Sequence, residues 1–348
     1  MRPTALAALI VTLCCFTGAA ADVLLIPDSS GDKIWAFDPF DGSVLSDDYV
    51  PADGNMVQPI NIVDSGRGTF LVSDENADAV LEYAITGEFL HVIAGPDQGL
   101  DALQGITVRD GAAYVGSRTA RGVYRVDLDT GAVELWAEEV GTPRDIVFRD
   151  DDVLITNSDT EANGGENIEQ YSLDGAFLAT FHDSDGVTGI DFPQQLQLEA
   201  DGNVIAAGFS TPRGLYSYDG FGNESAAFTN IITSPRGIVR LGNGKLLYAG
   251  GTRVMVYDPA TQTEETVINQ SRTSFRYIER SSAPVPIFGD VNRDGSVDVL
   301  DLVTLIQSQG PCPGPACLSD LNEDGVVDEE DQRIMRLLIG LLQPGDQL

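Results

Sequence analysis

The chain is poor in the residues that most often carry catalysis or bind polyanions. Its 348 residues include only two histidines, His91 and His182, both in segments that follow hairpin turns and are predicted to be outermost strands. This excludes a catalytic triad or a histidine-rich metal centre near the middle of the fold. Lysine and arginine total 20 against 54 aspartates and glutamates, a formal net charge of −34. Such a chain lacks the basic clusters that nucleic acids and anionic lipid surfaces require.

Long apolar runs are missing beyond the N-terminus, so no membrane span of about 20 residues is predicted. Residues 1–21 have the pattern of a cleaved signal peptide, with Arg2 near the start, an apolar run over residues 5–16 and small residues ending at Ala21. We therefore expect a secreted protein that is extracellular or associated with a cell surface.

Cysteine is also scarce. Cys14 and Cys15 are expected to leave with the signal peptide. The alternative is lipoprotein processing, but Leu13 stands where a small residue is expected before a lipidated cysteine. Cys312 and Cys317 remain in the mature chain, and in an oxidising compartment we expect them to form a disulfide. A cysteine-based metal site is the alternative, and it lacks further cysteine or histidine nearby.

Residues 22–282 repeat with a period of roughly 43 residues, which is typical of propellers and solenoids. One landmark is a strand with an aromatic residue, followed by a turn that often contains glycine; its copies are 34–38, 80–83, 123–127, 168–171, 215–219 and 254–258. The alternation of side chains has period two, which predicts strands. Four short strands per repeat predict a mainly β fold, a six-bladed β-propeller. The spare strand 274–279 is expected to complete the first blade and close the ring, leaving no open sheet edge.

Segments 235–248 and 23–34 resemble the repeats of NHL-type and lactonase-like propellers. The resemblance covers residues 22–282 and concerns the fold. It does not by itself imply an activity, because relatives of this kind include lactonases, lyases and interaction platforms.

Polar residues recur where the inner strands are predicted to begin, at one mouth of the central channel. They are Asn61, Arg144, Asp145, Gln194, Arg236 and Arg276. The arginines suit an anion such as a carboxylated sugar, although pairing with aspartates of neighbouring blades is the favoured interpretation. No catalytic residue is assigned.

A calcium ion on the axis, as in a lactonase-like site, would need carboxylate and amide ligands. Asp74, Glu75, Asn76, Asp145 and Asn157 are of these types, but no spacing makes them specific. Asn157 therefore joins the candidates at the channel mouth. The loop over residues 157–167 is a further candidate for calcium, with a solvated loop favoured.

Residues 283–289 read as a proline-containing linker. The pattern that follows at 290–301 recurs at 320–331, and in both copies positions 1, 3, 5, 9 and 12 carry oxygen-bearing side chains and position 6 is glycine. That spacing is typical of an EF-hand loop. Apolar residues in the runs after the loops, 302–306 and 332–340, are spaced as in helices. The two in-phase matches predict two calcium loops.

The repeated loop-then-helix pattern, with aspartate at position 12, resembles the type I dockerin. The resemblance implies a small α-helical domain over residues 290–348, two Ca²⁺ ions and a cohesin-type protein partner. The implied metal ligands are Asp290, Asn292, Asp294, Ser296, Asp298 and Asp301, then Asp320, Asn322, Asp324, Val326, Asp328 and Asp331. Two features depart from the family: the cysteine pair between the repeats, and Val299–Leu300 and Glu329–Glu330 in place of the usual hydroxyl pair.

Two functions of different classes follow. The favoured one is a secreted, non-catalytic recognition or scaffold propeller, which binds a glycan or small anionic ligand and is anchored in an extracellular assembly through the dockerin. The alternative is a propeller enzyme (lactonase, lyase or glycan-degrading) that the dockerin recruits to a polysaccharide-degrading complex. The sequence shows no pair of acidic residues that can be assigned as acid and base.

Overall fold

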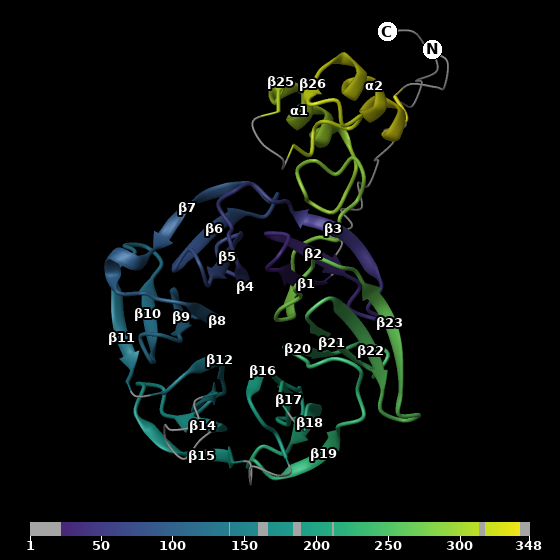
Figure 1. The fold of residues 1–348 in the computed structure, drawn as a ribbon. Coiled ribbons are helices and arrows are strands. Elements are labelled where there is room, and N and C mark those ends of the chain that lie inside the picture. The colour runs from purple at the N-terminus through teal and green to yellow at the C-terminus, as the bar shows by residue number, and fades with distance from the viewer. Residues whose placement is uncertain are drawn as a thin grey trace, which may run out of the picture.

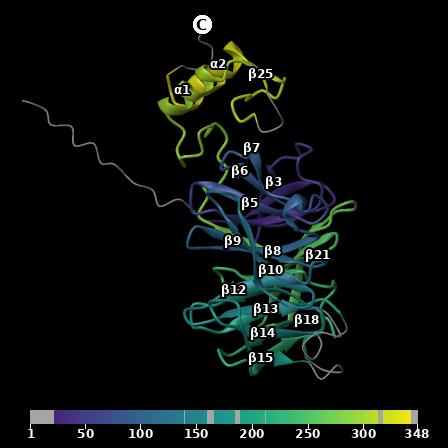
Figure 2. The ribbon, with the colours of Figure 1, turned by 90° about the vertical axis from the view of Figure 1, so that its left-hand side faces the viewer.

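A computed structural model describes the chain over residues 22–138, 140–158, 166–183, 189–210, 212–312 and 317–341. Six four-stranded sheets stand around a central axis, and a small helical lobe lies at the rim of the ring (Figure 1). Seen from the side, the ring forms the larger body and the lobe lies beyond it (Figure 2). The predicted six-bladed propeller is confirmed. The predicted signal peptide lies outside the described residues.

Each blade is an antiparallel meander. The strands of the first three blades are β1 (Val23–Asp28), β2 (Lys33–Phe37), β3 (Val44–Val50), β4 (Pro59–Asp64), β5 (Thr69–Asp74), β6 (Ala79–Ala84), β7 (Phe89–Ala94), β8 (Leu103–Arg109), β9 (Ala112–Ser117), β10 (Gly122–Asp127) and β11 (Val133–Ala137). A short 3-10 turn, η1 (Pro96–Gln98), lies before β8.

The other three blades follow the same order. Their strands are β12 (Pro143–Phe148), β13 (Val153–Asn157), β14 (Asn167–Tyr171), β15 (Phe177–Asp183), β16 (Pro193–Leu198), β17 (Val204–Gly208), β18 (Gly214–Tyr218), β19 (Glu224–Phe228), β20 (Gly237–Arg240), β21 (Leu246–Gly250), β22 (Arg253–Asp258) and β23 (Thr263–Asn269). His91 lies on β7 and His182 on β15, both outermost in their sheets as predicted.

The hydrophobic core lies between the blades. Six clusters of buried side chains each join two neighbouring sheets. Between blades one and two, for example, Tyr49 packs edge-on against Phe70, with ring centroids 6.2 Å apart. Middle strands such as β17 and β21 are buried along their whole length, so both of their faces are covered, while an outermost strand such as β19 is largely exposed.

The ring closes through β24 (Glu279–Ser281), which pairs with β1 and completes the first blade. The closing strand begins at Glu279 rather than at Ser274, because the preceding residues turn into the ring. Phe275 bridges Asp28 and Gly251, and the Ile278 backbone N–H donates to the Gln195 side chain at 2.9 Å. The prediction was right about the blade and wrong about the boundaries.

Inner strands start with irregular register. In β12 the pairing shifts between Pro143 and Ile146, and β8 and β16 shift at the equivalent place. A bulge of this kind re-aims the side chains of the extra residues. It turns Arg144 and Asp145 in blade four, and their counterparts in blades three and five, toward the central channel.

The C-terminal lobe contains α1 (Val299–Gln307), α2 (Glu329–Leu338) and a short ribbon of β25 (Gly310–Pro311) with β26 (Val326–Val327). Its small core is built on buried Leu305 and Met335, one from each helix. Cys312 and Cys317 form the predicted disulfide, with their Cα atoms 5.7 Å apart. Neither helix in this described part is long and apolar enough to cross a membrane.

Candidate functional site

The first calcium-type loop is held closed by its own carboxylates. Asp290 accepts hydrogen bonds from the backbone N–H groups of Asp294 and Gly295, at 3.1 and 2.9 Å. Asp301, fully buried, accepts from the N–H groups of Val291 and Asp298, at 2.9 and 2.8 Å. Carboxylates at positions 1 and 12 therefore bring the two ends of the loop together.

The second loop repeats this geometry. Asp320 accepts from the backbone at positions 5 and 6, at 3.1 and 2.7 Å. Asp331 makes the same two bonds as Asp301, at 2.7 and 2.8 Å. At position 6, Gly295 and Gly325 have φ of +88° and +89°, a conformation that only glycine adopts at little cost.

The same carboxylates start the helices. Asp298 is the N-cap of α1 and accepts from Leu300 N–H at 2.7 Å, and Asp328 caps α2 in the same way at 2.8 Å. Asp301 and Asp331 stand at N3 and accept from the N-cap backbone, completing a capping box in each helix. Folding of the loop and of its helix is thereby coupled.

The donors suit calcium, which takes six to eight oxygen ligands from carboxylates, amides and carbonyls. The twelve predicted positions lie in the two closed loops: Asp290, Asn292, Asp294, Ser296, Asp298, Asp301, Asp320, Asn322, Asp324, Val326, Asp328 and Asp331. Over the described ranges, no three His, Cys, Asp or Glu side chains are gathered into a metal-binding group. The donor types and loop shape fit Ca²⁺, and the ligand assignment stays a prediction.

Three of the predicted channel-mouth residues form a cluster that we call the arginine mouth: Arg144, Arg236 and Arg276. Arg144 donates from Nε to Ser158 Oγ at 2.7 Å and from Nη1 to Gln104 Oε1 at 2.9 Å. Burial, and then the neighbouring Arg276, lower the pKa of Arg236 to about 10. Across the described residues none of the three pairs with an aspartate, so the favoured interpretation stays a prediction.

The channel below the mouth is crossed by Tyr277. Its backbone N–H donates to Ile60 O of blade two at 3.4 Å, and its hydroxyl donates to Arg144 O of blade four at 3.0 Å. The preceding Arg276 N–H donates to Pro27 O of blade one at 3.0 Å, so the buried Tyr277 side chain reaches from the side of blade one to blade four. Asp145 and the three arginines all lie near its hydroxyl, which places Tyr277 between the arginine mouth and a carboxyl-lined cavity.

That cavity, of about 320 Å³, is lined by Asp145 and Glu279. Asp145 accepts from Leu196 N–H at 2.8 Å, and burial raises its pKa to about 7. Glu279 accepts from Gln195 Nε2 at 3.0 Å and from Asn61 Nδ2 at 3.3 Å. Burial, and then the charge of Asp145, raise the pKa of Glu279 to about 8.

The predicted mouth set therefore splits. Asn61 and Asp145 lie with the carboxyl cavity, apart from the arginines. Asn157 is held within blade four, where it accepts from Thr142 N–H at 2.9 Å and donates to Glu169 at 3.3 Å. Sequence reasoning missed Tyr277 and Glu279, whose signal was their place in the closing segment of the ring.

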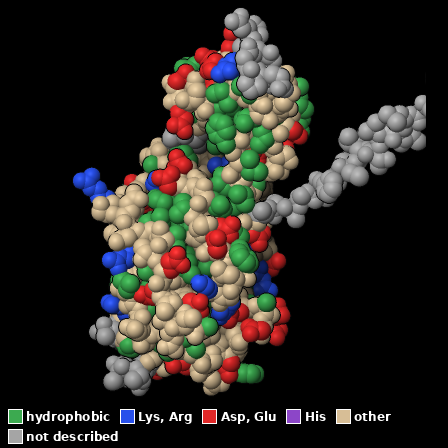
Figure 3. All heavy atoms as spheres, turned by 90° about the vertical axis from the view of Figure 1, so that its right-hand side faces the viewer, with side chains coloured by type: hydrophobic (Ala, Val, Ile, Leu, Met, Phe, Trp, Pro, Cys, Tyr) green, Lys and Arg blue, Asp and Glu red, His purple; other side chains and the backbone are tan. Residues whose placement is uncertain are grey.

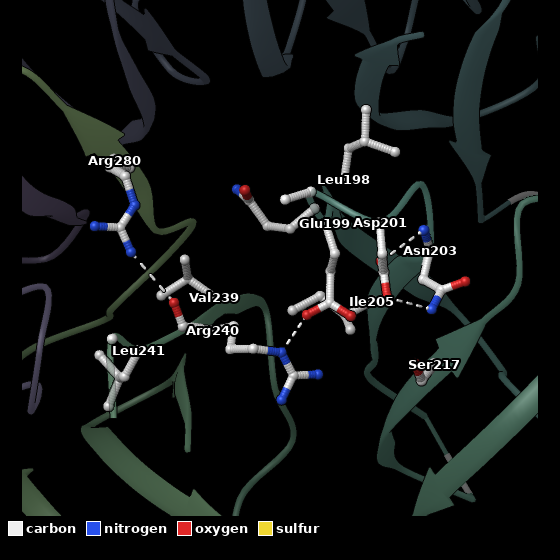
Figure 4. A pocket seen from close by; sticks show the side chains of 13 residues that line it. Leu198, Glu199, Asp201, Asn203, Ile205, Ser217, Val239, Arg240, Leu241 and Arg280 are labelled. Carbon is white, nitrogen blue, oxygen red and sulfur yellow. Dashed lines mark hydrogen bonds and ion pairs between the residues drawn. The ribbon is translucent and has the colours of Figure 1, made fainter. Parts of the chain in front are cut away.

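A larger open pocket of about 780 Å³ lies beside the carboxyl cavity, and Gln197 and Leu198 line both. Figure 4 shows its charged groups engaged with one another: Glu199 pairs with Arg240, and Arg280 donates to the Arg240 carbonyl at 3.2 Å. Because these side chains already contact one another, the pocket has few free hydrogen-bonding groups for a ligand.

The C-terminal lobe matches a known protein family. Residues 288–340 match the family described as the dockerin type I domain. The C-terminal lobe is a dockerin type I domain. Domains of this type generally bind Ca²⁺, their partners are cohesins, and the proteins that carry them are typically extracellular.

The propeller resembles a solved structure in its fold. It is similar to a chain in a solved structure titled "Crystal structure of Nidogen/Laminin Complex", with a TM-score of 0.63 and 15% identity. The match covers 74% of this chain and 98% of that one, and at this identity it shows the fold alone. No curated protein matches the chain. The NHL or lactonase-like subtype stays a prediction.

The dockerin is fixed to the propeller through its first loop. Arg293, at position 4, donates to the carbonyls of Ile85 and Tyr49 at 2.5 and 3.0 Å. Its guanidinium carbon lies 4.1 Å from the centre of the Tyr49 ring, whose hydroxyl donates to Pro284 O in the linker at 3.2 Å. The equivalent residue of the second loop, Glu323, is exposed. Only the first of these two loop positions is buried against the ring.

The two helices also present different surfaces. Along one face of α1, Val299, Leu300, Val303 and Ile306 are 56%, 54%, 44% and 43% exposed. The equivalent positions of α2 are charged: Glu329, Glu330, Arg333 and Arg336. In Figure 3, hydrophobic side chains gather on the near face of the lobe, while acidic ones are spread over the propeller below it. The dockerin thus keeps one apolar helix face uncovered.

Proposed function

We propose that the chain is a secreted recognition protein, in which the propeller binds a ligand and the dockerin holds it in an extracellular assembly. The attachment is a calcium-dependent contact between the dockerin and a cohesin-type partner. The supporting observation is the uncovered apolar face of α1, beside a second helix whose matching face is charged.

The choice of α1 follows from the free energy of burial. Four exposed aliphatic side chains at one helix face are unfavourable in water, and covering them gains about 25 cal/mol for each Å² removed from solvent. On α2, Arg333 already pairs with Glu330 at 2.6 Å, and burying that pair would cost its solvation. The partner therefore docks on α1.

Calcium binding and the start of α1 depend on the same side chains. Asp298 and Asp301 both cap α1 and belong to the predicted ligand set, so the loop that would hold the ion also orients the docking face. When bound, Ca²⁺ would neutralise the carboxylates that otherwise repel one another within each loop.

The test is a calorimetric titration of the full chain with a panel of type I cohesins, in Ca²⁺ and in EGTA. We expect binding in Ca²⁺ alone, weakened about 100-fold or more by Leu300→Asp, which places a charge in the apolar face. The matched control, Glu330→Asp at the equivalent position of α2, should retain the affinity. Absence of binding to every cohesin, or loss in the α2 variant only, would refute the proposal.

One observation favours the enzyme alternative. Asp145 is buried and Glu279 half-buried, the pKa of both carboxyls is raised, and both line a cavity, which is the environment of many acid–base groups. An enzyme of this kind would act on glycans or lactones and lose turnover in Asp145→Asn while keeping its melting temperature. Undiminished turnover in that variant would remove these residues from any catalytic role.

A further inference from the structure

The guanidinium groups of the arginine mouth are oriented by hydroxyl, amide and aromatic side chains, and among the described residues none of the three forms an ion pair with a carboxylate. Arg276 donates from Nε to Ser29 Oγ at 2.7 Å, and Arg144 uses Nε and Nη1 for Ser158 and Gln104. Within the described chain, Nη2 of Arg144 and both terminal nitrogens of Arg276 have no hydrogen-bond acceptor. Because these contacts hold the Nε edges, they fix the direction in which the terminal N–H groups point.

Arg236 is held by an aromatic ring instead of a hydrogen bond. Its guanidinium carbon lies 4.5 Å from the centre of the Phe209 ring, and its Nε is buried without an acceptor among the described residues. The nearby Gln194, only 1% exposed, likewise has a buried amide nitrogen with no acceptor there. Unspent buried donors of this kind are rare in folded proteins and call for an explanation.

The aromatic support of the mouth carries backbone strain. Phe192 has a φ of +48°, in the left-handed region that bulky residues seldom occupy. Its ring stacks under Arg144 at 4.9 Å and lies 5.6 Å from the Phe209 ring. Strain that is retained by the surrounding structure is typical of ligand sites.

Nearby carboxylates act on the cluster without a direct ion pair: burial lowers the pKa of all three arginines, and the charge of Glu75 partly offsets that lowering. Glu75 pairs with Arg118 at 2.9 Å, at the edge of the mouth. Glu166 faces Asp191, and burial together with this neighbour raises the pKa of Glu166 to about 7. Glu75 and Glu166 therefore lie close enough to act on the arginines by charge, while no ion pair joins them to Arg144, Arg236 or Arg276 among the described residues.

We propose that the arginine mouth binds the oxyanion of a ligand, a carboxylate or sulfate group that enters along the propeller axis. Tyr277 closes the channel behind it, so the ligand binds end-on and does not pass through. The Nη2 group of Arg144 and the two terminal nitrogens of Arg276, with Arg236 nearby, are suited to the oxygens of one planar or tetrahedral anion. This proposal names the class of ligand that the propeller binds in the recognition role proposed above. It depends on that role only for the extracellular location.

The experiment is a calorimetric titration of the full chain in calcium-containing buffer. Sodium galacturonate, trigalacturonate and sodium sulfate are the anionic probes, and galactose is the neutral control. We expect the anions to bind and galactose to give no heat. Tighter binding of trigalacturonate than of galacturonate would identify an acidic saccharide as the source of the anion, and equal binding of sulfate would identify the bare oxyanion. No heat from any of the three would overturn the proposal.

Variants separate a binding role from a structural one. Arg236→Met keeps the stem over Phe209 and removes the charge, so it should weaken anion binding about tenfold or more. Without ligand, the same change should raise the melting temperature by about 2 °C. It removes the repulsion between Arg236 and Arg276, and the methionine side chain buries no charge. Arg240→Met, in the satisfied pocket, is the control and should leave anion affinity unchanged.

Two outcomes would contradict the site. One is equal anion affinity in the Arg236 and Arg240 variants. The other is a lower melting temperature of Arg236→Met with unchanged binding, which would make the arginine a structural group. Cohesin binding through α1 is measured on the other domain, so failure of one proposal leaves the other standing.

Discussion

The two calcium loops of the dockerin share their internal hydrogen bonds and differ in what supports them. The first is held from outside by Arg293, which reaches the propeller backbone. The second is exposed at the matching Glu323 and has its own support: Cys312 N–H donates to Gly325 O at 3.0 Å, and Cys312 is disulfide-bonded to Cys317. A duplicated unit thus keeps its calcium chemistry while its copies acquire separate structural attachments.

The largest expected loss of stability comes from replacing the buried aspartate that both loops have at position 12. Asp301→Ala and Asp331→Ala each remove a buried carboxylate that joins both ends of a loop and caps a helix. Each should cost the domain about 3 kcal/mol or more and lower the calcium stoichiometry from about two to one. Calcium calorimetry on the full chain measures this. Glu323→Gln, at an exposed position outside the ligand set, is the control; unchanged stoichiometry in the aspartate variants would refute the loop assignment.

The stability of the propeller should change with pH in the direction opposite to that of the dockerin, because of two carboxyls near the propeller axis. The loop carboxylates must be ionised to hold calcium, so acid weakens the dockerin. Asp145 and Glu279 have pKa values of about 7 and about 8, above the unfolded values of about 3.9 and 4.3. Their contribution is fully present below the unfolded pKa and is lost as pH rises through 7 and 8.

Between the unfolded and the folded pKa, each carboxyl loses about 1.4 kcal/mol of stability per pH unit, and the loss stops above the folded pKa, where both states are ionised. Calorimetry between pH 5 and 9 should show the propeller transition moving to lower temperature up to about pH 8 and levelling off above it. The double variant Asp145→Asn, Glu279→Gln should flatten that dependence. An equally steep dependence in the variant would contradict this account.

Removing the outside support of the first loop comes next in size. Arg293→Ala removes two charge-assisted hydrogen bonds and a cation–π contact, which together stabilise the docked lobe by about 3 kcal/mol. The lobe should then move on its linker, and small-angle scattering should give a larger radius of gyration. Glu323→Ala should leave the scattering curve unchanged. Identical curves for wild type and Arg293→Ala would show that the contact does not hold the domains together.

The support of the second loop has the smallest expected effect. Replacing Cys312 and Cys317 by serine opens a short ring, which should cost about 2 kcal/mol. Calcium affinity of the second loop should fall more than that of the first, as read by calorimetry in the Asp301→Ala and Asp331→Ala backgrounds. An equal fall in both loops would mean that the disulfide stabilises the whole lobe rather than one repeat.

Much of the fold could be predicted because it repeats. The period of the aromatic strands indicates the six blades, and the spacing of Asp290 through Asp301 indicates the loop, since both depend on local patterns. The disulfide followed from the scarcity of cysteine. The closing strand was placed too early, because the turn of Phe275 and Ile278 into the ring depends on contacts with Gln195 and Gly251, far away in the sequence.

The propeller site was less predictable for the same reason. The positions of the arginines were predicted, but which side chains orient them depends on where the loops of other blades lie. Tyr277 reaches Arg144 across the axis, and nothing local in the sequence marks such a contact. The attachment of Arg293 to Ile85 and Tyr49 joins two domains and was likewise outside the reach of pattern reasoning.

The central claim is that the two repeats have the same calcium chemistry but different structural support. Amide hydrogen exchange of the full chain, with Ca²⁺ and after its removal by EGTA, tests it most directly. Both loops should be protected with Ca²⁺. After removal, residues 290–298 should keep more protection than residues 320–328, and Arg293→Ala should abolish the difference. Equal loss of protection in the two loops of the wild-type chain would contradict the account.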